Sequence, residues 1–233
     1  MSLTGLGAVC IWHDLLPEAV DEFYQWHNRE HMPERLGIAG FRRGRRFIAV
    51  AGAPTYFNLY EADNAEVLGG RDYLERLNSP TAWTRRVIAS FRRVSRSICR
   101  VAYSEGVGEG GFMLTQRFDV DAADAKRTSD ALRLHLLPPL AGRKGIAGVH
   151  LCLADEAISG IETAEKKARS EATAIPGWIV LIEGTSEIDV RDAGEWLTAG
   201  LRALPGMPAP AIDTSIYQLQ HALSKARSIT ASS

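Results

Sequence analysis

Residues 26–41 read WHNREHMPERLGIAGF, and this stretch combines a dense group of titratable side chains with a glycine-bounded turn. His27 and His31 are four residues apart, so they share one face of a helix, and Glu30 lies close to the same face. Upstream, apolar side chains recur at the spacing of a buried helical stripe: Leu16, Val20 and Phe23. We therefore expect both imidazoles to face inward, either as hydrogen-bonded core residues or as part of a functional pocket.

The glycine-bounded end of this stretch is repeated later in the chain. Residues 37–40 (GIAG) recur as residues 145–148, residues 54–61 (PTYFNLYE) resemble residues 176–183 (PGWIVLIE), and Ser97-Ile98 returns as Ser215-Ile216. We call these three pairs of similar segments sequence echoes. Because they occur in the same order in both halves of the chain, they indicate an internal duplication. The separation between the copies grows after the first echo, which predicts an insertion: a polar, helical arm at residues 155–174.

Hydrophobic periodicity gives both halves the same order of elements, β-α-β-β-α-β. In the first half we expect strands at residues 7–12, 41–51, 55–62 and 94–103, and helices that begin near Pro17, Asn64 and Trp83. In the second half we expect strands at 112–120, 148–153, 178–183 and 214–221, and helices at 123–137 and 190–204. Pro33 and Gly37 are expected to end the first helix of the first half, and Pro138-Pro139 the first helix of the second.

A βαββαβ unit folds as a four-stranded antiparallel sheet with both helices on one face, the ferredoxin-like arrangement. The uncovered sheet face needs a partner, and the second copy supplies one within the same chain. The predicted fold is therefore α+β: two tandem ferredoxin-like units whose antiparallel sheets pack into one barrel with the helices outside. The expected boundaries are repeat 1 at residues 1–105, a glycine-rich linker at 106–111, repeat 2 at 112–225 and a tail at 226–233.

The composition is that of a soluble globular protein, with 27 Lys and Arg against 28 Asp and Glu. This balance argues against a nucleic-acid partner, and the basic run at residues 85–100 lacks the interleaved aromatic side chains of a nucleic-acid platform. No apolar stretch is long enough to cross a membrane and no leader-like pattern opens the sequence, so we expect a cytoplasmic protein. Cys10, Cys99 and Cys152 are isolated in apolar runs and are expected to be buried free thiols.

The first half resembles a known superfamily. Residues 26–41, the strand NLYEA at 58–62 and the segment NSPTAWTRR at 78–86 are similar to the dimeric α+β barrel superfamily, nearest to its EthD-like members. The resemblance covers residues 1–104 and is mainly topological beyond them, where only His135 lies near the equivalent helix end. It implies a pocket between the helices and the sheet of one unit, and activities that include cofactor-free monooxygenases, isomerases, polyketide cyclases and haem-dependent enzymes. We therefore expect repeat 1 to carry the chemistry and repeat 2 to be mainly structural.

The candidate catalytic residues are His27, His31 and Glu30: one imidazole would move a proton and the carboxylate would orient it. The candidate substrate-binding residues are Arg35, Arg43, Arg45, Asn58, Tyr60 and Trp83. Strand alternation sends Arg43 and Arg45 to one sheet face, where their guanidinium forks suit a carboxylate or enolate; the alternative is a solvated, charge-protected edge strand. Asn58 and Tyr60 share a face of the next strand, and Trp83 would close the pocket mouth.

These residues predict a small-molecule enzyme that uses histidine-mediated proton transfer in isomerisation, cyclisation or cofactor-independent oxygenation of an aromatic or carbonyl metabolite. The alternatives are a non-catalytic ligand-binding or accessory barrel and a haem-binding protein. No cofactor and no metal are expected. Haem bound to His27 or His31, and zinc bound through the His27-x-x-Glu30-His31 spacing, are the cofactor alternatives left open. The expected partner is a small molecule, with homodimer formation left open.

Overall fold

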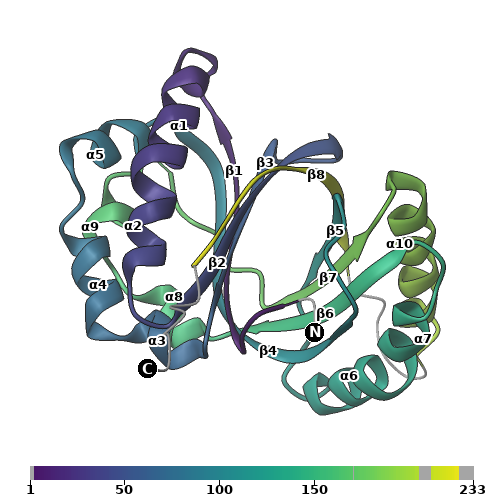
Figure 1. Cartoon of the computed structure of the whole chain (residues 1–233). Coiled ribbons are helices and arrows are strands. Elements are labelled where there is room, and N and C mark those ends of the chain that lie inside the picture. Colours follow the sequence, from purple (N-terminus) through teal and green to yellow (C-terminus); the bar gives the residue numbers. More distant parts are fainter. Residues whose placement is uncertain (1–2, 170, 205–210, 226–233) are drawn as a thin grey trace, which may run out of the picture.

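Eight antiparallel strands close into one barrel in the order β1-β3-β2-β8-β5-β7-β6-β4 (Figure 1). The computed structural model describes residues 3–169, 171–204 and 211–225; the expected tail at 226–233 lies outside them. The strands are β1 (Gly7–Leu15), β2 (Phe41–Ala51), β3 (Tyr56–Ala62), β4 (Phe91–Gly106), β5 (Phe112–Phe118), β6 (Ile146–Ala154), β7 (Trp178–Gly184) and β8 (Asp213–Ser224). The predicted barrel of two ferredoxin-like sheets is confirmed.

The two halves of the chain contribute sheets of the same internal order, β4-β1-β3-β2 and β8-β5-β7-β6. They join at both edges: β2 pairs with β8 from Arg43↔Ser224 to Ala51↔Ile216, and β4 pairs with β6 from Cys99↔Ala154 to Gly106↔Gly148. Every edge strand of one sheet is thereby hydrogen-bonded to an edge strand of the other, so the barrel has no unpaired edge. A single chain closes the structure.

The helices cover the outer faces of the two sheets (Figure 1). Those on the first sheet are η1 (Pro17–Ala19), α1 (Val20–Trp26), η2 (His27–His31), α2 (Met32–Gly37), α3 (Ala65–Gly69), α4 (Arg71–Asn78) and α5 (Ala82–Ile88). Those on the second are α6 (Ala125–Ala131), η3 (Leu132–Leu136), α7 (Leu137–Ala141) and α10 (Glu187–Arg202). No described helix is long and apolar enough to span a membrane.

The predicted helical insertion is present as α8 (Glu156–Gly160) and α9 (Ala164–Lys167). Although it belongs to the second half of the chain, it crosses to the first and lies beside α3 and α4 (Figure 1). Ile98 of β4 donates its backbone N–H to Ser159 (2.9 Å), and the side chain of Asn78 accepts from the N–H of Ala164 (3.1 Å). We call residues 155–174 the arm.

The helical run of the first half ends at Gly37, as predicted, but the prediction that prolines end the first helix of each half is wrong. Pro33 and Pro138 both lie inside continuous helices, two residues after a π-helical turn, η2 in one repeat and η3 in the other. A proline lacks the N–H of a helical bond and its ring collides with the carbonyl four residues earlier. A preceding turn that is widened to i→i+5 bonding relieves that collision, so the helix continues.

The two halves of the barrel correspond in a different register from the first sequence echo. Gly40 and Gly145 are the structurally equivalent glycines: both have positive φ (85° and 75°) and each directly precedes a strand, β2 or β6. The two GIAG segments therefore pair residues that are not equivalent in the fold. The second echo does align equivalent residues. Glu61 pairs with Ala8, the second residue of β1, and Glu183 pairs with Met113, the second residue of β5.

The interior of the barrel contains an apolar cluster and a charged network. All three cysteines are free and buried in the apolar part, as predicted. In the charged part, Arg43 forms two hydrogen bonds to Glu61 (2.7 and 2.9 Å). Arg45 lies between Glu183 (2.8 Å) and Glu61 (3.1 Å), and all four side chains are at most 2% exposed. Because β2 is paired on both sides, these arginines are not on a solvated edge strand, and their ion pairs hold them inside the barrel.

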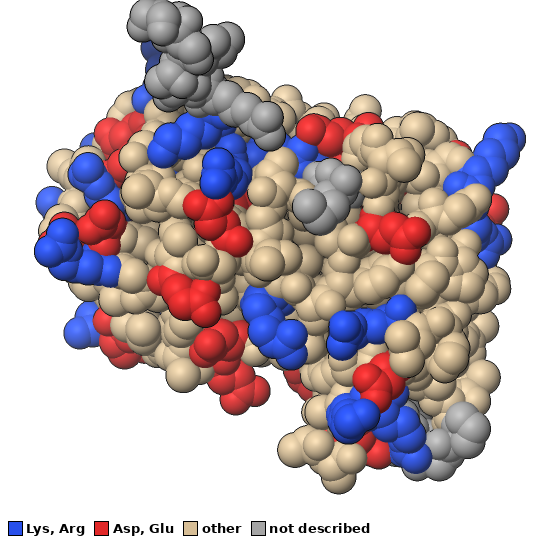
Figure 2. All heavy atoms as spheres, turned by 60° about the horizontal axis from the view of Figure 1, so that its bottom comes forward, with Lys and Arg blue, Asp and Glu red and all other residues tan. Residues whose placement is uncertain are grey.

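The surface carries both signs of charge. On the face shown in Figure 2, Lys and Arg alternate with Asp and Glu and no single-sign field develops. Within the basic run at 85–100, Arg86 pairs with Glu22 and Arg93 with Asp14. These pairings spread the charge of the run over local partners.

The buried charge network predicts a large, local stability effect. Glu61→Gln removes the shared partner of Arg43 and Arg45 inside the barrel, and we expect it to lower the free energy of unfolding by about 3–5 kcal/mol. Asp63→Asn breaks the exposed pair with Arg42 and should cost less than about 1 kcal/mol. Urea unfolding of both variants measures the difference. Similar small losses for both would contradict the account.

Candidate functional site

A small cavity of about 30 Å³ lies between the outer face of the first sheet and the helices above it. The predicted site residues that line it are His27, His31, Arg35, Asn58 and Tyr60. Its apolar walls come from Ile11, Trp26, Leu77, Ile88 and Phe91. A void of this size holds one or two water molecules. The structure therefore brings the inward histidines to a common hollow, but one smaller than an aromatic metabolite.

The π-turn η2 determines which side chains reach the cavity. In this wider turn each residue rotates less about the helix axis, so His31 stays near His27, with ring centroids 5.7 Å apart, while Glu30 is carried away. Glu30 instead accepts hydrogen bonds from the hydroxyls of Thr81 (2.6 Å) and Thr84 (3.0 Å). The prediction that Glu30 orients an imidazole is wrong, because it assumed α-helical spacing.

His27 is held between a cation and a phenol. Arg46 approaches its Nδ1 at 3.2 Å, and the Tyr60 hydroxyl lies 3.0 Å from its Nε2. A guanidinium only donates, so Nδ1 must accept, and the ring proton is on Nε2 and is donated to Tyr60. Burial, followed by the charge of Arg46, lowers the pKa of His27 well below its usual value. His27 is thus a neutral ring that leaves the Tyr60 O–H free to donate into the cavity.

A third histidine, which the sequence analysis did not single out, orients Asn58 in the same way. His13 Nδ1 donates to the carbonyl of Asp14 (3.2 Å), so its Nε2 accepts from the Asn58 amide nitrogen (3.0 Å). The Asn58 Oδ1 atom is buried without a hydrogen-bond partner. Burial lowers the pKa of His13 to about 3. Continuing the strand beyond Trp12 would have placed His13 on the face of Ile11.

His31 contributes an unpaired ring nitrogen to the site. Its Nδ1 is buried and has no hydrogen-bond partner, and its ring lies 4.2 Å from that of Trp26 between centroids. Burial, followed by the charge of Arg35, lowers its pKa well below the usual value. A neutral imidazole with an unpaired nitrogen facing a hollow is suited to accept a proton.

The arm completes the cavity with two residues that the sequence analysis missed, Glu165 and Arg169. Glu165 forms a buried ion pair with Arg35 of α2. Repeat 2 therefore supplies part of the site of repeat 1 as well as half of the barrel. Trp83 does not close the mouth: it lies in a separate shallow groove beside Tyr24 and Arg86.

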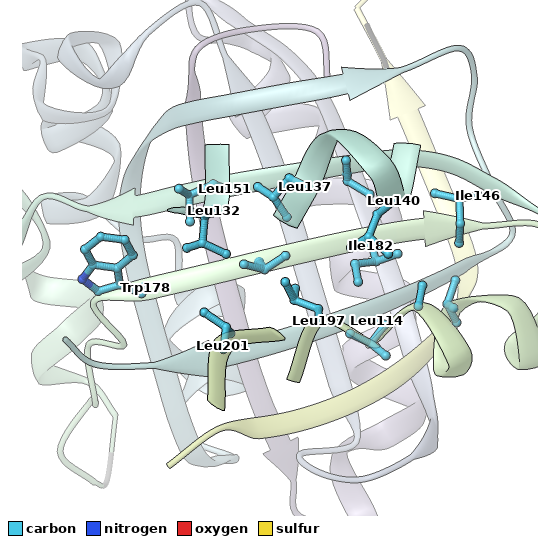
Figure 3. Packing of buried hydrophobic residues seen from close by; sticks show 14 of the residues in the cluster. Leu114, Leu132, Leu137, Leu140, Ile146, Leu151, Trp178, Ile182, Leu197 and Leu201 are labelled. Atoms are coloured by element: carbon cyan, nitrogen blue, oxygen red, sulfur yellow. The ribbon is translucent and has the colours of Figure 1, made fainter. Parts of the chain in front are cut away.

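The equivalent layer of repeat 2 is filled by aliphatic side chains (Figure 3). Leu132 begins η3 where His27 begins η2, and Leu151 and Ile182 occupy the strand positions of Arg46 and Tyr60. These leucines and isoleucines pack with Leu137, Leu140 and Leu197 across the gap between sheet and helices. The polar groups found in repeat 1 have no counterpart there.

The residues present do not fit the two cofactor alternatives. Among the described residues no group of three His, Cys, Asp or Glu side chains could hold a metal ion, and Glu30 points away from both imidazoles. Both nitrogens of His27 have hydrogen-bond partners, so this ring offers no free nitrogen to a haem iron. His31 retains a free nitrogen, but its ring is covered by Trp26.

Solved structures share this fold over nearly the whole chain. An anthrone oxidase-like protein matches with a TM-score of 0.66 at 13% identity, covering 100% of this chain and 99% of its own. A proposed monooxygenase from Fusobacterium nucleatum matches with a TM-score of 0.61 at 8% identity, covering 96% of each chain. Another from Lactobacillus acidophilus gives 0.58 at 12% identity, covering 94% and 96%. No family model and no curated protein sequence matches. The fold is that of these monooxygenase-like barrels.

Buried histidines predict that the protein loses stability in mild acid. When unfolded they take up protons below about pH 6.5, whereas the folded state keeps them neutral, so the free energy of unfolding falls as the pH decreases. For His13 alone, a folded pKa of about 3 corresponds to a loss of about 2 kcal/mol between pH 7 and pH 5.

His13→Asn should therefore reduce the loss between these pH values by about 2 kcal/mol, as measured by urea unfolding. The matched control is His135→Asn, because His135 is solvent-exposed. An unchanged pH dependence in His13→Asn would show that this ring is not held neutral by the fold.

Proposed function

We propose that the protein is a small-molecule enzyme in which His31 accepts a proton from a substrate carbon and Tyr60 stabilises the oxyanion that forms. One observation supports this proposal most strongly: His31 and Tyr60 line the same cavity. The Nδ1 atom of His31 is buried without a hydrogen-bond partner, and the Tyr60 O–H is directed away from His27. A base and an oxyanion donor facing one space are the minimum for enolisation. The histidine role was expected from the sequence; its division between His31 as base and His27 as positioning residue comes from the hydrogen bonds.

The environment makes each group suited to that task. The neutral His31 can act as a base without first losing a proton, since its pKa is depressed. Burial raises the pKa of Tyr60, so this phenol remains protonated and donates a hydrogen bond instead of ionising. Arg46 acts through His27, whose Nδ1 it occupies, and keeps the Nε2 proton directed at Tyr60.

Cofactor-independent oxygenation is the reaction we favour among those that use this set. Its first step removes a proton from a ketone whose enol form is a phenol. The resulting enolate is rich in electrons and can reduce O₂ directly. For an anthrone, one O₂ is consumed, one oxygen atom becomes the new carbonyl, the other leaves as water, and the product is an anthraquinone. The fold similarity to an anthrone oxidase-like protein supports this choice. Isomerisation and cyclisation would use the same base without consuming O₂.

Substrate entry requires the cavity to enlarge, because about 30 Å³ admits no aromatic ring. The arm is the cover that we expect to yield. Backbone hydrogen bonds to β4 fix its two ends at Asp155 and Ala174. Between these ends it is attached to repeat 1 through the Arg35–Glu165 pair and the Ser159 and Asn78 hydrogen bonds, whereas the floor consists of barrel strands. Displacing it exposes the histidine face without breaking the sheet.

The test is oxygen consumption with anthrone as probe, measured with an electrode and by formation of anthraquinone. His31→Gln should lower the rate by about 10²–10⁴-fold and Tyr60→Phe by about 10²–10³-fold, because the base and the oxyanion donor are lost respectively. His135→Gln is the matched control and should retain the full rate. Product without O₂ uptake would indicate isomerisation or cyclisation. Equal rates in all variants, or no turnover of any probe despite ligand binding, would support a non-catalytic barrel.

A further inference from the structure

Two arginines that neither the sequence analysis nor the proposed reaction uses lie on the wall of the same cavity. Arg96 belongs to β4 and Arg169 to the arm. Arg96 is 8% exposed and donates from Nη2 to the Tyr73 hydroxyl (3.0 Å). Arg169 donates from Nη1 to Thr173 (3.0 Å), while its Nε is buried with no acceptor. The backbone fixes the two segments together, since the N–H of Arg96 donates to the carbonyl of Ala174 (2.8 Å).

These two guanidinium groups lack a counter-charge. Within the described parts of the chain, neither takes part in an ion pair, and the one acidic residue that lines the cavity, Glu165, is paired with Arg35. Burying like charges side by side without an anion is costly. Burial and then the positive charge of Arg96 lower the pKa of Arg169 to about 10, and the opposing charge of Glu165, which is paired with Arg35, does not cancel this shift.

The surroundings of the pair are apolar on the other sides. Leu77, Ile88 and Phe91 line the cavity together with the two arginines. A ligand that satisfies this combination has a flat apolar body and a terminal anion with two oxygens, because an arginine fork is matched in shape to a carboxylate. A neutral ligand could accept a hydrogen bond from Arg169 Nε, but it would bring no negative charge to the two guanidinium groups.

We propose that Arg96 and Arg169 form a receptor for the carboxylate of an aromatic acid. This inference deepens the proposed function and rests on it in one respect: the site that holds the carboxylate is the one in which His31 and Tyr60 act on the ring carbonyl. The preferred substrates are then carbonyl-bearing aromatic compounds that also carry a carboxylate, whereas neutral anthrone reacts at the same groups without this additional contact. The carboxylate stays bound and unchanged, and only the carbonyl-bearing part reacts.

The receptor is tested with a matched pair of probes, benzoate and its neutral isostere benzamide. Binding is measured by titration calorimetry, and by the fluorescence of Trp26 in the cavity wall as a second readout. We expect the wild-type protein to bind benzoate at least 10-fold more tightly than benzamide. Arg169→Gln should weaken benzoate binding by about 10–100-fold, the loss of one or two charge-assisted hydrogen bonds, and leave benzamide binding unchanged.

Two further variants test whether the loss of affinity comes from the guanidinium group itself. Lys167→Gln removes a positive charge from an exposed position of the same arm and should leave benzoate binding unchanged. Arg169→Lys keeps the charge without the fork and should recover part of the affinity. If Arg169→Gln does not fold, Arg96→Gln tests the same receptor from the barrel side.

The outcomes separate this inference from the proposed function. His31→Gln should still bind benzoate while losing turnover, so a catalytic failure does not imitate a binding failure. Equal binding of benzoate and benzamide, or the same loss of benzoate affinity in Lys167→Gln as in Arg169→Gln, overturns the receptor even if anthrone turnover depends on His31. Absence of benzoate binding to the wild-type protein also overturns it.

Discussion

The pairing of two half-covered sheets is the constraint on which the rest of this structure depends. Each four-stranded sheet has helices on one face and needs a cover for the other. The contacts β2–β8 and β4–β6 provide this cover within one chain and remove every free edge at the same time. Closure also buries four charged side chains, and they are retained because Arg45 lies between Glu61 and Glu183, one glutamate from each repeat.

The sequence predicted the parts of the fold that follow from periodicity. Strand and helix order, the duplicated unit, the helical arm and the buried cysteines all follow from local patterns that the barrel preserves. The π-turn could not be predicted, because one widened turn leaves no periodic signal, and Glu30 and Pro33 were misinterpreted for that reason. Alternation placed Arg43 and Arg45 on one sheet face correctly but did not indicate that this face was the barrel interior. The recurring glutamate at 61 and 183 was the available signal.

The candidate site was predictable in part for the same reason. His27, His31, Asn58 and Tyr60 belong to contiguous elements of one repeat, and their facing follows from helix and strand geometry. The contributions of Glu165 and Arg169 could not be predicted, since they reach the site from more than a hundred residues away along the chain. The hydrogen-bond directions at His27 and His13 also required coordinates, because a ring's tautomer is set by its partners.

The arm shows what joining two units in one polypeptide makes available. In an assembly of identical subunits every cavity occurs once per subunit, with the same sequence around it. A segment that covers the cavity of one subunit, or a leucine that fills it, is therefore present in every subunit. Covalent fusion removes this obligation: the second unit could fill its own layer with aliphatic side chains and extend a segment over its neighbour. The resulting hollow is a joint product of both units, so neither half of the gene encodes a complete one.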